Sequence, residues 1–309
     1  MRQLVILSGK GGTGKTTLAS AFVRLSRTRA CADCDVDAPN LHLVNGLYTS
    51  HKSAPYFGLP LAQITPAACV SCGECHRSCR FDAIIPGKPY HVNPYACEGC
   101  GVCLPVCPVF AIQMKPHKAG SMTLFRKGDA VFSTAKLKMG SGTSGLLVSQ
   151  VKKRMKEAAR EDVPFAIVDG SPGIGCPVIA TLSGADVTLI VTEPSVSGIS
   201  DLERIVKTAR GFGVRVAVCV NKADINPEKT AEIKRYCERE TLFFAGVIPF
   251  DPAAIQAVNR GLSIADIPCP SGKAAEEIYR KILPMLKTER PMASTLSASA
   301  QTALEEEML

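Results

Sequence analysis

The sequence predicts an α/β fold, in which a mostly parallel sheet flanked by helices is interrupted by a second, small domain. Short apolar runs alternate with helical patterns along most of the chain, and such strand–helix–strand units build parallel sheets with helices on both faces. A glycine-rich turn joins the first strand to the first helix. Between residues 58 and 115 the alternation stops, and cysteine and proline become frequent. We therefore expect a module inserted into one larger α/β domain.

Apolar and β-branched runs predict the strands of the sheet, at 2–8, 29–37, 164–170, 186–192, 214–220 and 242–248. Helical patterns begin at about Lys15 and cover 144–160, 198–213, 227–240 and 273–287, and 120–137 is typical of a hairpin. The expected domains are a discontinuous one of 1–57 and 116–288, an insert of 58–115, and a disordered tail of 289–309 rich in Ser, Ala and Thr.

The composition indicates a cytoplasmic protein with metal or redox chemistry. No apolar run approaches the ~20 residues that a membrane-spanning helix needs, and the N-terminus does not resemble a signal peptide. We therefore expect no transmembrane segment. The 14 cysteines indicate metal or redox chemistry, because thiols of the cytosol stay reduced.

The net charge of +8 is concentrated in residues 115–160, which hold eleven Lys and Arg against two acidic residues. This basic region has two interpretations, a solvated face or a docking site for an acidic partner, nucleic acid or anionic lipid.

The segment "SGKGGTGKTT" at 8–17 fits the pattern of a phosphate-binding loop, Gly-x4-Gly-Lys-Thr, between a strand and a helix. Its glycines let backbone N–H groups converge on phosphate oxygens, and the helix N-terminus adds a positive dipole. Lys15 is expected to reach the β and γ phosphates of a nucleotide, and Thr16 to bind Mg²⁺. The predicted nucleotide-binding residues here are Gly9, Lys10, Gly11, Gly12, Thr13, Gly14, Lys15, Thr16 and Thr17.

The loop carries a second lysine, Lys10, and in this it resembles the deviant phosphate loop of the MinD/ParA ATPases and the nitrogenase iron protein. In that family the extra lysine reaches across a dimer to the partner's phosphates, so the resemblance implies a nucleotide-sandwiched homodimer, or a heterodimer with a similar ATPase. "ADCDVDAPN" at 32–40 resembles the first switch, and "IVDGSPGIG" at 167–175 the second. The resemblance implies that Lys10, Lys15 and Asp35 are catalytic, that Thr16, Asp35 and Asp169 serve Mg²⁺, and that Asp33 and Asn40 support them.

The base of the nucleotide is predicted less directly. "NKAD" at 221–224 matches both an adenine-contacting Asn of these relatives and the guanine-reading motif of GTPases. "VIPFDP" at 247–252 resembles the MinD-type segment that closes over the base. We therefore expect ATP rather than GTP, with contacts from Asn221, Pro249 and Asp251.

The insert repeats Cys-x2-Cys-x2-Cys-x3-Cys at an offset of 28 residues, which resembles the bacterial ferredoxins with two [4Fe–4S] clusters, small α+β domains. In those proteins the fourth cysteine of each run binds the other cluster. The resemblance thus implies one cluster on Cys69, Cys72, Cys75 and Cys107, and a second on Cys79, Cys97, Cys100 and Cys103. One departure is Arg80, where the pattern expects the proline that does follow Cys107. The alternative occupant is zinc, which usually takes paired Cys-x2-Cys knuckles.

Of the other six cysteines, Cys31, Cys34 and Cys219 are expected in the core, and Cys31 and Cys34 on opposite faces of a strand. Cys176 follows Asp169 at the offset of an interface cluster ligand in the nitrogenase iron protein. It is either a metal ligand between subunits or a small residue in a tight turn.

These features together predict a MinD-like P-loop ATPase with an inserted ferredoxin domain, which couples nucleotide state to electron transfer or metal-cluster tasks with a redox or metallocluster partner. Three alternatives remain: a positioning ATPase of the ParA or MinD kind on DNA or membrane, an iron–sulfur carrier or assembly ATPase, and a non-enzymatic assembly factor. The acidic C-terminus "QTALEEEML" lacks the basic amphipathic helix of a membrane anchor.

Overall fold

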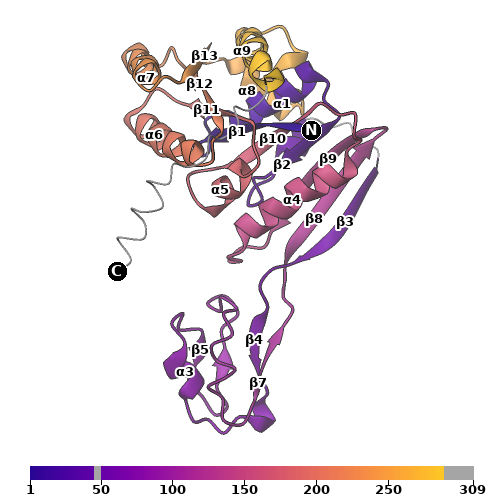
Figure 1. Cartoon of the computed structure of the whole chain (residues 1–309), viewed down its shortest axis with the longest axis vertical. Helices are drawn as coiled ribbons and strands as arrows, with labels where there is room; N and C mark the ends of the chain where they lie inside the picture. The colour runs from indigo at the N-terminus through magenta and orange to yellow at the C-terminus, as the bar shows by residue number, and fades with distance from the viewer. Residues whose placement is uncertain (45–49, 289–309) are drawn as a thin grey trace, which may run out of the picture.

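A computed structural model of the chain describes residues 1–44 and 50–288, so the predicted tail at 289–309 lies outside the described residues. A large α/β part carries a smaller lobe that projects from one edge of its sheet (Figure 1). Within the described residues, no helix is long and apolar enough to cross a membrane.

The main sheet has the strand order β13-β12-β11-β1-β10-β2-β9-β8-β3. The first seven strands of this order are parallel, and β8 and β3 extend the sheet with antiparallel pairs. The predicted strands form β1 (Arg2–Ser8), β2 (Ala30–Asp33), β10 (Phe165–Pro172), β11 (Val187–Thr192), β12 (Arg215–Asn221) and β13 (Phe243–Ile248). The predicted hairpin is formed by β8 (Lys118–Lys127) and β9 (Ala130–Leu137).

Strand β2 is shorter than the predicted span of 29–37. The regular pairing of β2 with β9 ends at Asp33, and the backbone N–H of Cys34 donates to the carbonyl of Asp169 on β10. Residues 34–40 are therefore a connecting segment beyond the carboxyl end of the strand, which we call the 34–40 segment.

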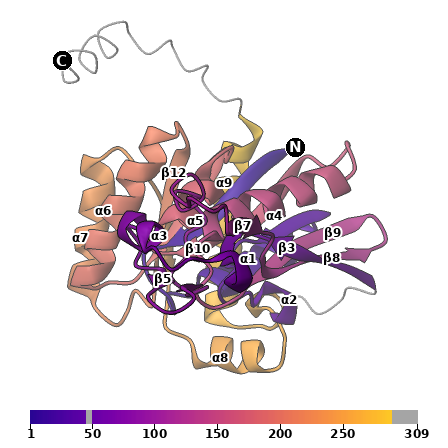
Figure 2. The same ribbon diagram turned by 90° about the horizontal axis from the view of Figure 1, so that it is seen from below.

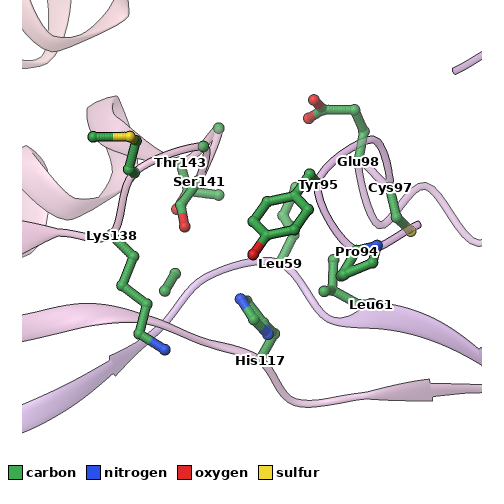
Figure 3. A pocket seen from close by; sticks show the side chains of 14 residues that line it. Leu59, Leu61, Pro94, Tyr95, Cys97, Glu98, His117, Lys138, Ser141 and Thr143 are labelled. Atoms are coloured by element: carbon green, nitrogen blue, oxygen red, sulfur yellow. The ribbon is translucent and has the colours of Figure 1, made fainter. Parts of the chain in front are cut away.

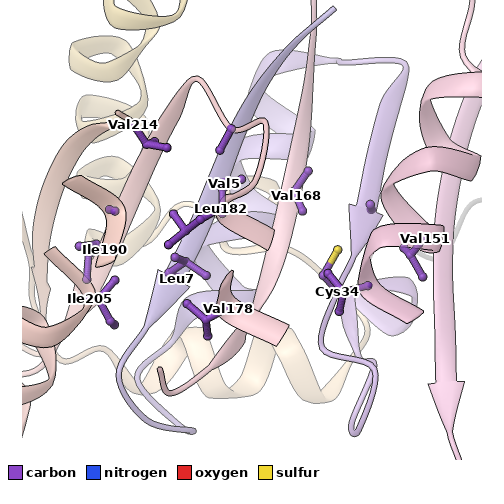
Figure 4. Packing of buried hydrophobic residues seen from close by; sticks show 14 of the residues in the cluster. Val5, Leu7, Cys34, Val151, Val168, Val178, Leu182, Ile190, Ile205 and Val214 are labelled. Carbon is purple, nitrogen blue, oxygen red and sulfur yellow. The ribbon is translucent and has the colours of Figure 1, made fainter. Parts of the chain in front are cut away.

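The helices cover both faces of the sheet, as the alternating pattern predicts. One face packs against α4 (Ser144–Ala158), α5 (Cys176–Leu182), α6 (Val196–Gly211) and α7 (Pro227–Arg239), and the other against α1 (Lys15–Ser26) and α9 (Pro270–Lys287). In β1, Val5 and Leu7 face the first core (Figure 4) and Leu4 and Ile6 face the second. A central strand buried on both faces needs such a continuous apolar run.

Shorter helices α2 (Leu41–Val44) and α8 (Pro252–Asn259) stand near the carboxyl edge of the sheet. Seen from below, α6 and α7 occupy one end of the molecule and β3, β8 and β9 the other (Figure 2).

Strand β3 (Ser50–Phe57) has no counterpart in the sequence prediction. It pairs antiparallel with β8 at the edge of the sheet, and its side chains are mostly exposed. The chain leaves the sheet after Phe57 and returns at Lys118, which are paired with each other. Everything between them forms the smaller lobe.

The smaller lobe is built from two short ladders and little else. Strands β4 (Leu61–Ile64) and β7 (Ile112–Lys115) pair antiparallel, as do β5 (Ile84–Ile85) and β6 (His91–Val92). A helix α3 (Glu74–Ser78) and a 3-10 turn at Pro66–Ala68 complete it. Its own core contains Ile64, Ile84 and Ile112 together with several of its cysteines.

One lysine of the basic region is buried. Lys152 on α4 is 5% exposed, and its Nζ donates to the carbonyls of Thr181 and Ser183 at the end of α5, the latter at 2.6 Å. Burial is the main reason that the pKa of Lys152 falls to about 8. The interpretation of Lys152 as part of a solvated face or a docking site is therefore wrong, because its ammonium is buried and donates hydrogen bonds to carbonyls at the C-terminal end of α5.

Candidate functional site

The predicted phosphate loop connects β1 to the N-terminus of α1 at the carboxyl edge of the sheet. Gly12 and Gly14 adopt φ of 80° and 86°, which favours glycine. A Cβ built on Gly11 or Gly12 would meet no atom within 4 Å, so the loop is open on that side. A Cβ on Gly14 would lie 2.3 Å from the Asn221 side chain, so only glycine fits there. The loop thus presents an uncovered turn of backbone, as a phosphate requires.

Lys15, Thr16 and Asp169 meet beneath this loop. The Nζ of Lys15 lies 2.7 Å from Oδ1 of Asp169, and the hydroxyl of Thr16 donates to Oδ2 at 2.6 Å. Lys15 and Asp169 are 5% and 0% exposed. Burial alone would lower the pKa of Lys15, but the charge and hydrogen bond of Asp169 raise it overall. The structure therefore brings together the cation, hydroxyl and carboxylate that the sequence assigns to phosphate and Mg²⁺.

Asp33 braces the 34–40 segment. Its Oδ1 accepts the N–H of Asp35 at 3.0 Å, and its Oδ2 accepts the N–H groups of Asn40 and Leu41 at 2.9 and 3.0 Å. Burial, and then the charge of Asp169, raise the pKa of Asp33 to about 7. Asp33 thus holds the backbone around Asp35 in place.

The second predicted switch, residues 167–175, is bonded to the first. The hydroxyl of Ser171 donates to the carbonyl of Cys34 at 2.6 Å, beside the Cys34–Asp169 backbone bond of 2.7 Å. The carboxylate of Asp35 lies 3.7 Å from the Nζ of Lys15. Burial raises the pKa of Asp35, and the charge of Lys15 opposes this rise. The predicted catalytic and Mg²⁺ residues Lys15, Thr16, Asp35 and Asp169 therefore form one cluster.

A neighbouring pocket is lined by the predicted base-contacting residues. Asn221, Pro249 and Asp251 line it with apolar side chains that include Phe250 and Ile255. The Nδ2 of Asn221 donates to the carbonyl of Thr13 at 2.8 Å, which ties β12 to the phosphate loop.

Two acidic residues beside this pocket have structural partners. Asp251 accepts the N–H groups of Ala253 and Ser271 at 2.9 and 3.0 Å, so its carboxylate caps α8. Asp224, the last residue of the NKAD motif, accepts the N–H of Phe250 at 2.6 Å. Its carboxylate thus holds the 249–251 turn in place.

Sequence reasoning missed Glu193, which follows β11. Its carboxylate lies 3.2 Å from the Nζ of Lys10 and 2.6 Å from the Nζ of Lys222. Lys10, the second lysine of the loop, is therefore ion-paired within its own chain. The signal was available, because Glu193 follows a parallel strand at the same sheet edge as the phosphate loop.

The eight cysteines of the repeat line two cavities in the smaller lobe. The first is lined by Cys69, Cys72, Cys75 and Cys107, and the second by Cys79, Cys97, Cys100 and Cys103. Each cavity thus receives three cysteines from one run and the last from the other. Burial raises the pKa of Cys103 to about 11, while backbone N–H donors, that of Ser71 first, lower the pKa of Cys69. Apolar side chains such as Val70 and Phe81 stand at their rims.

The other cysteines are distributed as the sequence predicts. Cys31, Cys34 and Cys219 are buried, and Cys31 and Cys34 pack in the cores on opposite faces of the sheet. Cys176 is exposed at the first residue of α5, beside Gly145 of α4. Over residues 1–44 and 50–288, no group of three or more His, Cys, Asp or Glu side chains is arranged to hold a single metal ion.

A further cavity lies where the smaller lobe meets the main sheet (Figure 3). Tyr95, Cys97 and His117 line it from the lobe, and Lys138 and Thr143 from the loop between β9 and α4. A Cβ on Gly142 of that loop would lie 3.1 Å from Oε2 of Glu98. The loop before α4 therefore packs against the chain around Cys97.

The fold agrees with comparisons to known proteins. The sequence model of the CobQ/CobB/MinD/ParA nucleotide binding domain (CbiA) matches residues 4–264. The chain belongs to this family. The CobQ/CobB/MinD/ParA relatives include an uncharacterised protein of Methanocaldococcus jannaschii, 30% identical over 91% of this chain and 96% of the relative. The iron-sulfur cluster carrier protein of Pyrococcus furiosus is 24% identical over 92% of this chain and 86% of its own.

Solved structures of the family share the architecture. The septum site-determining protein MinD of Pyrococcus horikoshii, complexed with Mg-ADP, superposes with a TM-score of 0.56. The similarity covers 93% of this chain and 99% of that one at 17% identity, so it establishes the fold alone. The prediction of a MinD/ParA-type P-loop domain with a large, mostly parallel sheet is confirmed.

Proposed function

We propose that this chain is an ATP-hydrolysing, dimeric switch protein that carries two [4Fe–4S] clusters in an inserted ferredoxin domain. In this proposal residues 1–57 and 116–288 bind the nucleotide, and residues 58–115 hold the clusters. The nucleotide state controls electron transfer, or a metal-cluster task, with a partner protein.

The observation that carries the proposal is the crossed lining of the two cysteine cavities. Cys107 joins Cys69, Cys72 and Cys75 around one cavity, although it lies in the other run of the sequence. Cys79 joins the other three in the same way. Four thiolates around an apolar cavity are the donor set of an iron–sulfur cubane, which supplies one-electron transfer when bound. The crossed fourth ligands tie the two halves of the lobe together.

The phosphate site supports ATP hydrolysis. The ammonium of Lys15 and the loop N–H groups neutralise phosphate charge, and Thr16 and Asp169 offer oxygen ligands for Mg²⁺. When the phosphates of a nucleotide bind the Lys15 ammonium, the Asp169 carboxylate leaves its ion pair with Lys15 and can serve Mg²⁺. Asp35, held by Asp33, is positioned to orient the attacking water.

Adenine is favoured over guanine by the partners of the NKAD motif. A guanine-reading Asp must keep its carboxylate free for the base, whereas that of Asp224 accepts the N–H of Phe250. The apolar wall around Phe250 remains available to a purine face. ATP is therefore the proposed substrate.

The deciding experiment is anaerobic spectroscopy of the purified full chain, with and without ATP and Mg²⁺. The proposal expects close to eight irons per chain, low-temperature paramagnetic signals after reduction, and a change in those signals or in the midpoint potential when ATP binds. Colourless, zinc-filled protein contradicts the cluster assignment. Identical spectra and potentials in both nucleotide states contradict the coupling.

The relative named as an iron-sulfur cluster carrier favours a second candidate function, delivery of a cluster to another protein. The exposed Cys176 at the start of α5 is the residue that supports it, as a ligand of a bridging cluster between two subunits. Transfer of iron and sulfide to an apo-ferredoxin, abolished in Cys176→Ser and retained in Cys237→Ser, supports the carrier function. No transfer from wild-type protein rejects it.

A further inference from the structure

Lys10 has a partner within its own chain. Its Nζ lies 3.2 Å from Oε2 of Glu193, and the Lys10 side chain remains 39% exposed. Glu193 is 17% exposed in the loop between β11 and α6, where its own carbonyl accepts the N–H of Ser195 at 2.8 Å. The carboxylate is therefore fixed by its loop, whereas the lysine is free to leave.

A second lysine competes for the same carboxylate. The Nζ of Lys222 lies 2.6 Å from Oε1 of Glu193 and 3.4 Å from the carbonyl of Gly12. Glu193 thus stands between two ammonium groups, one on the phosphate loop and one on the turn after β12. These two lysines lower the pKa of Glu193 against the effect of burial, so the carboxylate is charged at neutral pH.

We propose that Glu193 is a positioning residue that holds Lys10 on its own subunit until the nucleotide of a second copy of the chain attracts it. The inference rests on the proposed dimeric switch, together with the reach of Lys10 across the dimer that the resemblance to the MinD/ParA ATPases implies. Lys222 weakens the hold, because it shares the carboxylate. The three residues then set the nucleotide concentration at which two chains associate.

The strength of the contact suits this role. A partly exposed ion pair contributes little net free energy, so it breaks readily when a stronger acceptor appears. The triphosphate of a bound nucleotide carries more negative charge than one carboxylate, and phosphate oxygens form strong charge-assisted bonds with lysine. The exchange of Lys10 from Glu193 to phosphate is therefore favourable only in the presence of the second, nucleotide-loaded chain.

The test compares two substitutions with opposite expected effects. Glu193→Gln removes the negative charge that holds Lys10. Lys222→Gln removes the competing ammonium, so the Glu193 carboxylate pairs with Lys10 only. The dimer fraction of anaerobically purified holoprotein is measured by light scattering against the concentration of a non-hydrolysable ATP analogue. Analogue affinity is measured separately at low protein concentration, because Lys222 lines the base pocket.

Glu193→Gln should lower the half-maximal concentration for dimerisation about two- to five-fold, and Lys222→Gln should raise it, after correction for affinity. The single variant Lys10→Ala and the double variant Lys10→Ala/Glu193→Gln should show the same half-maximal analogue concentration for dimerisation, because Glu193 then has no Lys10 to hold. The inference is overturned if Glu193→Gln dimerises no more readily than wild type. It is also overturned if the effects of Lys10→Ala and Glu193→Gln on dimerisation add in the double variant. Failure of wild-type protein to bind the analogue or to dimerise at saturation overturns the proposed function instead.

Discussion

The backbone N–H of Leu137, at the end of β9, donates a 2.8 Å hydrogen bond to the carbonyl of Val36 in the 34–40 segment. The next residue, Lys138, donates to the carbonyl of Ala119 at 2.7 Å, where the chain returns from the smaller lobe. The segment that holds Asp35 is therefore joined to the base of the lobe through two successive backbone bonds.

The lobe should be removable without loss of nucleotide binding. Phe57 and Lys118 are paired neighbours, so a two-residue Asn-Gly turn can join β3 to β8 in place of residues 58–117. The shortened chain should fold and show the same rise in Tm on adding ATP and Mg²⁺ as the full chain, while iron content falls to zero. An unfolded product, or one whose Tm does not respond to ATP, would mean that the lobe supports the nucleotide site.

Substitution of cysteines should pair residues across the two runs. Cys107→Ser and Cys75→Ser should alter the same paramagnetic signal, because both side chains line one cavity, and Cys79→Ser should alter the other. Each should lose about half of the iron when that cluster fails to assemble. Cys237→Ser, in the core far from the insert in sequence, is the matched control. If Cys107→Ser instead affects the signal of Cys97 and Cys100, the fourth ligands are not crossed.

Asp169→Asn should destabilise the nucleotide-free protein. The substitution leaves the buried ammonium of Lys15 without its closest counter-charge, and breaking a buried pair in this way costs ~3 kcal/mol. The exposed Asp37 on the neighbouring segment provides the control, and Asp37→Asn should change the free energy of unfolding little. Urea unfolding in EDTA measures the free energy of unfolding of both variants. Equal free energies for the two variants would contradict the prediction and show that Asp35 replaces Asp169 as the counter-charge of Lys15.

The raised pKa of Asp33 predicts a pH effect of unusual sign. Its pKa is about 7 in the folded chain against 3.8 for an unperturbed aspartate, so between these values the folded state binds more protons than the unfolded state. Stability contributed by Asp33 therefore falls as pH rises through this window. The variant Asp33→Asn does not titrate and so does not lose stability in this way. The difference in free energy of unfolding, variant minus wild type, should therefore increase from about pH 5 to about pH 8. A constant difference between the two proteins across that range contradicts the assignment.

Asp224→Asn should leave the preference for ATP over GTP unchanged, because the Asp224 carboxylate is bonded to the backbone of Phe250. The affinities of both nucleotides, measured by fluorescence with Asn221→Ala as a comparison, test this. A selective loss of GTP binding in Asp224→Asn would identify the residue as a guanine reader.

Local patterns in the sequence were enough to predict the parallel core. The apolar run of β1 is buried on both faces, and the phosphate loop follows it directly, so pattern and motif agreed. Strand β3 escaped prediction because "SHKSAPYF" carries polar residues and a proline, which an exposed edge strand tolerates and a buried one does not. Its partner β8 lies on the far side of the insert, and pairing at such a distance leaves no local signal.

In the site, residues defined by motifs were predicted and residues defined by three-dimensional contact were not. Lys15 and Thr16 could be named from the phosphate-loop pattern and Asp169 from the resemblance to the second switch, and the structure brings the three within hydrogen-bond distance. Glu193 belongs to no motif, and only the folded sheet brings it to Lys10 and Lys222. Lys152 was indistinguishable from its basic neighbours until burial separated it from them.

The hydrogen bonds from Lys152 to the carbonyls of Thr181 and Ser183 join α4 to the end of α5. Helix α5 begins directly after residues 167–175, and α4 begins after the loop in which a Cβ on Gly142 would lie 3.1 Å from Oε2 of Glu98. In the proposed function, a displacement of the chain beyond Asp169 would reach α4 through α5, because Cys176 lies beside Gly145 at one end of the two helices and Lys152 bonds to the carbonyls at the other. Loss of these hydrogen bonds would therefore weaken the proposed coupling without removing a residue of the phosphate site or of the cysteine cavities.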